Sequence, residues 1–176
     1  MQRSEKKLPP LSGNVLWLIP SDPARQLYRN AIDHFSALYG TPEFTPHLTF
    51  GSLPEISSEK LESILKKYSS QINSLELEAD FLRCSSNPFR NLVHQLTVSD
   101  RYRELAEGLV SEIPDFRPKR ELHISLKYGY DHCAELDRVF GESNLQLPDK
   151  IRFSAIEMIS LGSTVEDWKV LFRKTI

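Results

Sequence analysis

The sequence PHLTF at residues 46–50 and the sequence LHISL at residues 122–126 share one order: histidine, apolar residue, hydroxyl residue, apolar residue. Strict alternation of polar and apolar residues is typical of a β-strand with one buried face. Residues two apart in a strand project from the same face, so each stretch places an imidazole beside a hydroxyl. Both stretches therefore predict strands that present a histidine and a hydroxyl to one side of a sheet.

A third match to the same pattern, HFSA at residues 34–37, lies where apolar residues recur at helical spacing between Ala24 and Leu38. In a helix, residues two apart diverge by about 200° around the axis. His34 and Ser36 therefore cannot share a site, and only the two strand histidines remain as a candidate pair.

Strands and helices alternate along the rest of the chain. Strands are predicted at residues 14–20, 44–53, 75–84, 92–98, 122–126, 151–161 and 168–172. Helices are predicted from residue 24 to Gly40, at 59–72, from Ser99 or Asp100 to near Pro114, and at 131–140, the first of them opened by Ser21-Asp22-Pro23. Two rounds of strand, helix, histidine-bearing strand and helix predict an α+β protein with an internal duplication whose halves meet near residue 85.

The composition bounds the class of protein. With 40% apolar and 26% charged residues among 176, the chain is globular, and disorder or fibrous repeats are excluded for most of it. A net charge of −2 argues against a protein that mainly coats duplex nucleic acid. The longest apolar run, residues 15–19, is far shorter than the roughly 20 residues of a membrane-spanning helix. We expect a flexible leader at residues 1–12, a single domain at residues 13–176, a monomer, and no membrane partner.

Cysteine usage gives a further expectation. Cys84 and Cys133 are too few for a disulfide framework, and no closely spaced His/Cys set offers a metal a ligand pair. We therefore predict no metal site and a location in the reducing cytoplasm.

Beyond the two tetrapeptides, the chain resembles the two-histidine (2H) phosphoesterases, in their cyclic phosphodiesterase branch. The resemblance is carried by LWLIP at 16–20, PHLT at 46–49, HISLKY at 123–128 and EDWKV at 166–170, and covers nearly the whole chain after residue 13. Leu122 and Lys127 depart from the branch, which commonly has proline and an aliphatic residue at these places.

The resemblance implies a bilobal, duplicated α+β fold with two antiparallel sheets facing across a central cleft and helices outside. It implies no metal or other cofactor. The implied reaction is hydrolysis of 2′,3′-cyclic nucleotides to 2′-phosphates, or of ADP-ribose 1″,2″-cyclic phosphate to the 1″-phosphate, so the expected partner is a small cyclic phosphate nucleotide.

The chemistry of a phosphodiester gives the matched residues their roles. Of His47 and His123, one would activate water while the other protonates the departing ribose oxygen, and family analogy favours His123 as the base. Thr49 and Ser125 would hold phosphate oxygens. Two imidazoles in opposite protonation states predict a bell-shaped pH profile with limbs near the reference histidine pKa of about 6.5.

Three aromatic residues are candidates for substrate binding. Tyr128 matches an aromatic residue of this branch that lies near the substrate. Phe89 and Trp168 can stack on a nucleobase; Phe89, in a predicted loop, fits core packing equally well, and Trp168, on a predicted strand, fits core packing better.

The other polar candidates are weaker indicators of a functional role than the two histidine stretches. The loop with Arg117, Lys119 and Arg120 can attract a second phosphate or an RNA backbone, or be an ordinary solvated loop. His94 and His132 fit structural or surface roles.

Two other functions remain open at this level. One is an RNA-end-processing 2H enzyme that acts on 2′,3′-cyclic or 2′-5′ linked RNA 3′ ends. The other is a nucleotide- or RNA-binding module without turnover. A phosphate binder would lose little by replacing a titrating histidine with a permanent cation, so two histidines with two hydroxyls favour an enzyme.

Overall fold

The structure is a computed structural model that describes residues 7–176, so residues 1–6 of the predicted leader lie outside the described residues. The remainder of that leader touches the domain. Leu8 packs against a cluster that contains Phe44 and Tyr128. The Leu11 amide donates a hydrogen bond to the Gly162 carbonyl.

Strands outnumber helices. The strands are β1 (Asn14–Pro20), β2 (Leu48–Leu53), β3 (Glu76–Cys84), β4 (Leu92–Leu96), β5 (Arg117–Pro118), β6 (Leu122–Lys127), β7 (Lys150–Ser160) and β8 (Lys169–Thr175). The helices are α1 (Ala24–Tyr39), α2 (Ser58–Lys67), α3 (Ser69–Asn73), α4 (Asp100–Glu112), α5 (Cys133–Glu142) and the short 3₁₀ turn η1 (Val165–Asp167).

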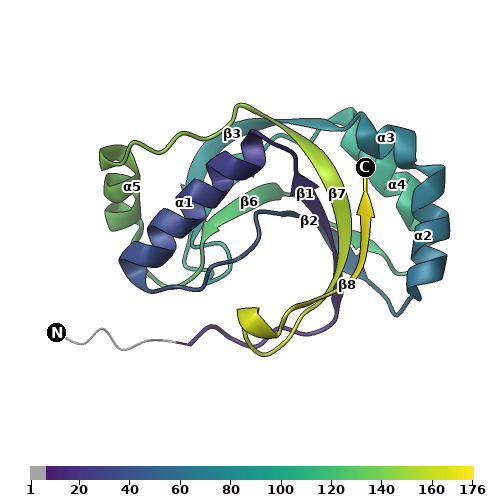
Figure 1. Cartoon of the computed structure of the whole chain (residues 1–176), viewed down its shortest axis with the longest axis horizontal. Helices are drawn as coiled ribbons and strands as arrows, with labels where there is room; N and C mark the ends of the chain where they lie inside the picture. The colour runs from purple at the N-terminus through teal and green to yellow at the C-terminus, as the bar shows by residue number, and fades with distance from the viewer. Residues whose placement is uncertain (1–6) are drawn as a thin grey trace.

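The strands pair in an antiparallel order that returns on itself. The order is β1-β2-β6-β4-β3-β7-β8, and β7 also pairs with β1. The predicted α+β class with antiparallel pairing is confirmed, and the two predicted sheets are joined into one strongly curved array (Figure 1). The joints are the β2–β6 pairing on one side and the β3–β7 pairing on the other.

Helices cross between the two predicted sequence repeats. Helix α1 follows β1 but packs against β6, and its Tyr28 hydroxyl bonds His94 Nδ1 on β4 at 2.8 Å. On helix α4, from the second repeat, the Tyr102 hydroxyl donates a hydrogen bond to the Phe50 carbonyl on β2. Figure 1 shows α1 and α5 at one end of the sheet and α2, α3 and α4 at the other. Each repeat therefore helps to bury the strands of the other.

The helix ends follow local chemistry in most places. Ser57 and Ser99 cap α2 and α4 by accepting hydrogen bonds from backbone amides. Helix α1 begins after Pro23 without a side-chain cap, so the expected cap from the preceding residues is wrong. The single helix predicted at 59–72 is two helices that meet at Tyr68, whose hydroxyl donates to the Gly108 carbonyl of α4.

Cys84 and Cys133 form a disulfide, which the sequence analysis did not predict. The pair joins the end of β3 to the start of α5. A lasting disulfide is typical of oxidising compartments, unlike the reducing cytoplasm expected from the sequence. None of the helices within residues 7–176 has the length and apolar character needed to cross a membrane.

The buried His94 makes stability depend on pH. Burial lowers its pKa from 6.5 to about 4, so between these values the unfolded chain binds a proton that the folded chain does not. His94 should therefore contribute stability above pH 6.5 that is lost as the pH falls toward 4.

We expect His94→Asn, which keeps a polar atom near Nδ1 for Tyr28, to reduce the stability difference between pH 7 and pH 4.5 by about 2 kcal/mol. Urea denaturation at both pH values measures this difference. The exposed His34→Asn is the control, and an unchanged difference in His94→Asn would contradict the assignment.

Candidate active site

The register between β2 and β6 brings the two histidine stretches together. Leu48 pairs with Ile124 in an antiparallel bridge. In antiparallel pairing, the residue before one partner faces the residue after the other. His47 therefore lies beside Ser125, and Thr49 lies beside His123. Leu48 and Ile124 are completely buried in the main core, so the four polar side chains share the opposite face.

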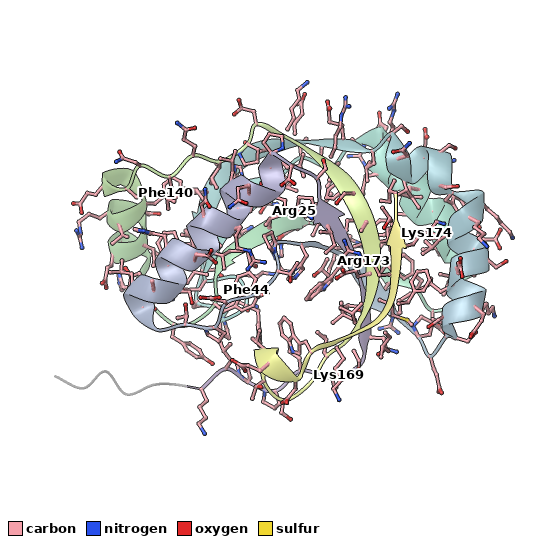
Figure 2. The ribbon with its side chains drawn as sticks, in the orientation of Figure 1. Arg25, Phe44, Phe140, Lys169, Arg173 and Lys174 are labelled. Atoms are coloured by element: carbon pink, nitrogen blue, oxygen red, sulfur yellow. A yellow bond between two sulfur atoms is a disulfide. The ribbon has the colours of Figure 1, made fainter. Side chains whose placement is uncertain are left out.

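The same face continues across the neighbouring strands, and we call it the site face. Thr49 pairs with Trp17 on β1, and Trp17 pairs with Glu157 on β7. On the other side, His123 pairs with Gln95 on β4. The buried Glu157 carboxylate is bound by Arg173 of β8, which Figure 2 labels next to Lys174. The site face therefore crosses six strands with the two histidines at its middle.

His47 is held by a backbone carbonyl and an indole ring. Its Nδ1 lies 2.7 Å from the Thr45 carbonyl oxygen, so Nδ1 carries the proton and Nε2 is the free nitrogen of the neutral ring. The ring stacks on Trp17 with 3.5 Å between centroids and 9° between planes. Burial lowers the pKa of His47 to about 4, while the Thr45 carbonyl acts in the opposite direction. The imidazole is thus neutral at pH 7, with its orientation fixed.

His123 lies in a more positive environment. The pKa of His123 is lowered to about 3, first by burial and then by the nearby charges of Arg90, His47, Lys119 and Arg83. Of the three cations predicted on the loop before it, Lys119 acts on His123, whereas Arg117 and Arg120 are exposed. A neutral His123 is therefore strongly favoured at pH 7.

The two hydroxyl residues differ in their surroundings. Thr49 is half-buried on β2 between Trp17 and His123. Ser125 is buried, and its hydroxyl donates to the Phe89 carbonyl at 3.0 Å. Ser125 would have to rotate its hydroxyl to donate to a phosphate, whereas in this structure it fixes the loop that carries Phe89.

The three predicted substrate-binding aromatics form one cluster beside His47. Tyr128 lies 6.0 Å from Trp168 and 5.5 Å from Phe89 between ring centroids, and Trp168 lies 5.9 Å from Trp17. Burial raises the pKa of the Tyr128 phenol, although a hydrogen bond with Ser125 acts in the opposite direction. Trp168 Nε1 is buried and has no hydrogen-bond partner among residues 7–176.

The loop of residues 85–91 is rigidly built. The Ser85 hydroxyl donates to the Arg90 carbonyl at 2.8 Å, and the Phe89 amide donates to Asn87 Oδ1 at 2.9 Å. Asn91 donates to the carbonyls of Ser85 and Asp131. These bonds present Phe89 on one side of the loop and Arg90 on the other.

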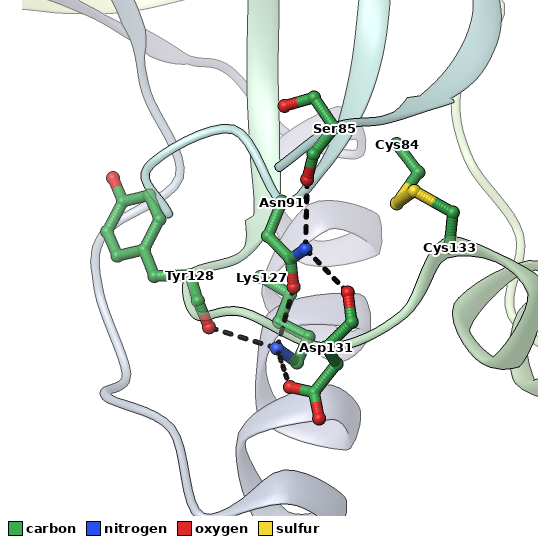
Figure 3. A network of polar contacts seen from close by, with 7 residues as sticks. All are labelled: Cys84, Ser85, Asn91, Lys127, Tyr128, Asp131 and Cys133. Atoms are coloured by element: carbon green, nitrogen blue, oxygen red, sulfur yellow. Dashed lines mark hydrogen bonds and ion pairs between the residues drawn. A yellow bond between two sulfur atoms is a disulfide. The ribbon is translucent and has the colours of Figure 1, made fainter. Parts of the chain in front are cut away.

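The buried ammonium group of Lys127 stabilises this loop. Lys127 is 1% exposed, and its Nζ donates to Asn91 Oδ1 at 2.9 Å and to the Tyr128 carbonyl at 3.1 Å. Asp131 forms an ion pair with it (Figure 3). The Cys84–Cys133 disulfide lies next to the same network (Figure 3). Lys127, noted as a departure in the sequence, is therefore neutralised and hydrogen-bonded rather than solvated.

Sequence reasoning missed several residues at the site. Trp17 and Phe44 were read as ordinary strand residues, yet Trp17 stacks on His47 and Phe44 stacks on Tyr128 at 3.9 Å. Arg83 and Arg90 act on His123 from β3 and from the loop. The one sequence feature that could have indicated Arg83 is the alternation in the predicted strand at residues 75–84, which assigns each side chain to one of the two faces of the strand. Within residues 7–176, no three His, Cys, Asp or Glu side chains gather as a metal site would require.

Comparisons with known proteins agree with this architecture. A family model described as “Cyclic phosphodiesterase-like protein” matches residues 12–121. Among solved structures, the apo form of E. coli LigT aligns with a TM-score of 0.51 and 18% identity, over 94% of this chain and 98% of LigT. A crystal structure described as a phosphoesterase aligns with a TM-score of 0.51 and 15% identity, over 94% of this chain and 99% of its own. At these identities the likeness is one of fold. No curated protein matches the chain.

The buried Lys127–Asp131 pair predicts a non-additive mutant series. Asp131→Ala leaves a buried ammonium without its counter-charge and should cost about 3 kcal/mol of unfolding free energy. Adding Lys127→Met removes that charge, so the double variant should recover most of the loss. Chemical denaturation of the single and double variants measures this recovery. Asp33→Ala, which breaks an exposed ion pair with Arg29, should change stability by less than about 1 kcal/mol. A double variant as unstable as Asp131→Ala would show that the pair does not carry the effect.

Proposed function

The chain belongs to the cyclic phosphodiesterase-like family, and from this premise we propose that it hydrolyses 2′,3′-cyclic nucleotides, or ADP-ribose 1″,2″-cyclic phosphate, by two-histidine acid–base chemistry. Family membership makes it a phosphodiesterase of the 2H superfamily, as the sequence predicted. The proposal goes further in naming the substrate and the residues, and the reaction it assigns needs no metal.

The observation that carries the proposal is the Leu48–Ile124 pairing. It sets two imidazoles and two hydroxyls side by side on one face, with each histidine next to the hydroxyl of the other stretch. In-line displacement at phosphorus needs a base near the attacking oxygen and an acid near the leaving oxygen. It also needs donors for the charge on the remaining oxygens. One site offers all three.

The proposed reaction has one displacement step. His123 takes a proton from water, and the water oxygen forms a bond to phosphorus. The bond between phosphorus and ribose O3′ breaks, and His47 gives its proton to O3′. The product is the 2′-phosphate, His123 is left protonated, and exchange with solvent resets both rings.

The assignment of base and acid follows from the surroundings of each ring. Burial keeps His123 unprotonated, and the charges of Arg90 and Lys119 act in the same direction; this is the state that a general base needs. His47 has the Thr45 carbonyl and the face of Trp17 as neighbours, and both stabilise an imidazolium. The bound phosphate anion supplies the charge that favours protonation of His47.

The aromatic cluster supports a nucleoside-bearing substrate. Phe89, Tyr128 and Trp168 lie on the His47 side, where any nucleobase can stack on a ring. The partnerless Trp168 Nε1 is a donor that a ligand oxygen would satisfy. We assign this side to the nucleoside and Thr49 to the phosphate.

Phosphorus NMR of 2′,3′-cyclic AMP in the presence of EDTA tests the proposal. We expect conversion to 2′-AMP that survives the chelator, because the acid and the base are side chains. His47→Ala and His123→Ala should each lower kcat by at least about 100-fold. The matched control is His34→Ala, which removes an exposed histidine of the same tetrapeptide pattern and should leave the rate unchanged.

Two results would overturn the assignment. Loss of activity in EDTA that added metal restores would contradict a two-histidine reaction. No conversion of 2′,3′-cyclic AMP, ADP-ribose 1″,2″-cyclic phosphate or RNA 3′ ends would favour the binding module.

The optimum of the pH profile should lie at a lower pH than the reference histidine pKa of about 6.5 would give. Because burial lowers the pKa of His47 to about 4, the fraction of free enzyme with a protonated acid falls as the pH rises above that value. We expect kcat/KM to rise as the pH is lowered from 8 to 5, with its optimum below 6.5. Initial rates at subsaturating substrate measure this profile. An optimum above pH 7 would contradict the assignment of His47 as the acid.

A further inference from the structure

A second group of charged residues lies on the far side of His123 from the aromatic cluster. His123 lines a cavity of about 220 Å³ together with Arg83, Arg90, Gln95 and Glu121. Arg83 comes from β3, and Arg90 from the rigid loop 85–91. The reaction proposed above uses none of these four residues directly.

The two arginines converge on one oxygen atom. Arg83 Nη1 lies 3.6 Å and Arg90 Nη1 lies 3.7 Å from the same atom, Glu121 Oε2. Both distances exceed those of a charge-assisted hydrogen bond, about 2.7–2.9 Å. Glu121 is 59% exposed, so these ion pairs are weak and the carboxylate is free to swing into solvent. Glu121 Oε2 thus marks a position where two guanidinium groups meet an anionic oxygen.

Resting on the proposed function, we propose that Arg83 and Arg90 bind a second phosphate of the substrate, attached on the 5′ side of the cyclised ribose. The phosphate displaces the Glu121 carboxylate and takes its place between the two guanidinium groups. The preferred substrate is then a cyclic phosphate that carries a further phosphoryl group, and bare 2′,3′-cyclic AMP is a minimal substrate.

The placement of the arginines fits such a substrate. Arg83 pairs with Val93, and Val93 pairs with Ser125, so Arg83 lies two strands from the hydroxyl residue of the site. At about 4.8 Å per strand this separation is about 10 Å, within reach of a nucleoside that carries phosphates on both sides of its ribose. The hydrogen bonds of the loop hold the backbone of Arg90 in place before any ligand arrives, which lowers the entropy lost on binding.

The size and charge of the cavity favour one compact anion over a long strand. Sites for drug-sized ligands measure about 300–1,000 Å³, and this cavity of about 220 Å³ is smaller. The chain carries a net charge of −2, and Glu121 repels further phosphates. The geometry therefore points to a single phosphate group at this position.

Steady-state kinetics with four substrates test the proposal. The substrates are 2′,3′-cyclic AMP, its 5′-phosphorylated form, ADP-ribose 1″,2″-cyclic phosphate, and a dinucleotide that ends in a 2′,3′-cyclic phosphate. We expect the 5′-phosphate to raise kcat/KM about tenfold or more, mainly through KM, because each guanidinium forms a charge-assisted bond with it. The second and fourth substrates distinguish a free nucleotide from an RNA end as the source of the phosphate.

The double variant Arg83→Gln/Arg90→Gln removes the proposed contacts. It should reduce the ratio of kcat/KM with the 5′-phosphate to kcat/KM without it to less than about twofold. Any change in the pKa of His123 acts on both substrates alike and leaves this ratio unaffected. Both side chains are partly exposed, so the fold should persist, and a thermal melt checks this. Arg120→Gln is the matched control, because this exposed arginine lies outside the cavity and should leave the advantage intact.

Glu121→Gln tests the same contacts in the opposite direction. Removal of the competing carboxylate should lower KM for the 5′-phosphorylated substrate and change KM for the bare substrate less.

The results separate the inference from the function on which it rests. If the enzyme hydrolyses 2′,3′-cyclic AMP but a 5′-phosphate gives no advantage, or one that the double variant keeps, the inference is wrong and the proposed function stands. If wild-type protein hydrolyses none of the four substrates, the proposed function itself fails. A preference for the dinucleotide that the double variant keeps would place its 5′-side phosphate elsewhere and overturn the inference.

Discussion

β2 and β6 meet, among the described residues, through the single pair Leu48 and Ile124, and the arrangement of the site depends on that contact. Both side chains are completely buried in the main core. If either strand slipped by one residue, this favourable burial would be lost and the folded state would be less stable. A shift by one residue would turn each histidine away from the site face and expose an apolar neighbour. The hydrophobic core therefore holds the register that brings His47 and His123 together. Helices that cross between the repeats reinforce this register, because each covers strands of the other repeat.

Burial also sets the charge states at the site. Both imidazoles are kept neutral by the loss of solvent, yet the site must attract an anion. The positive charge comes instead from the side chains of Arg83, Arg90 and Lys119. All three lie near His123, so the field across the site is uneven. In the proposed reaction, this uneven field favours the unprotonated form of His123, and His47 receives a proton when the phosphate binds.

Local sequence patterns predicted the features that depend on residues close together in the sequence. Alternation predicted the strands, serines marked the starts of α2 and α4, and two tetrapeptides named the histidines and hydroxyls that share one face of the sheet. The missing features join residues that are distant in sequence. Cys84 and Cys133 are 49 positions apart and meet where β3 ends and α5 begins. Arg83 and Arg90 converge only because the loop between them folds back on itself. No periodicity encodes such meetings, since they depend on how the strands pair.

Lys127 shows why a departure from a family pattern need not weaken a site. A buried ammonium costs solvation free energy, and an aliphatic residue would avoid that cost. Here the ammonium bonds Asn91 at the end of loop 85–91 and pairs with Asp131. The loop presents Phe89 toward the aromatic cluster and Arg90 toward the cavity beside His123, so one support orders both sides of the proposed substrate site. Ordering achieved during folding is not lost again on binding, and a rigid loop of this kind raises affinity without an added contact.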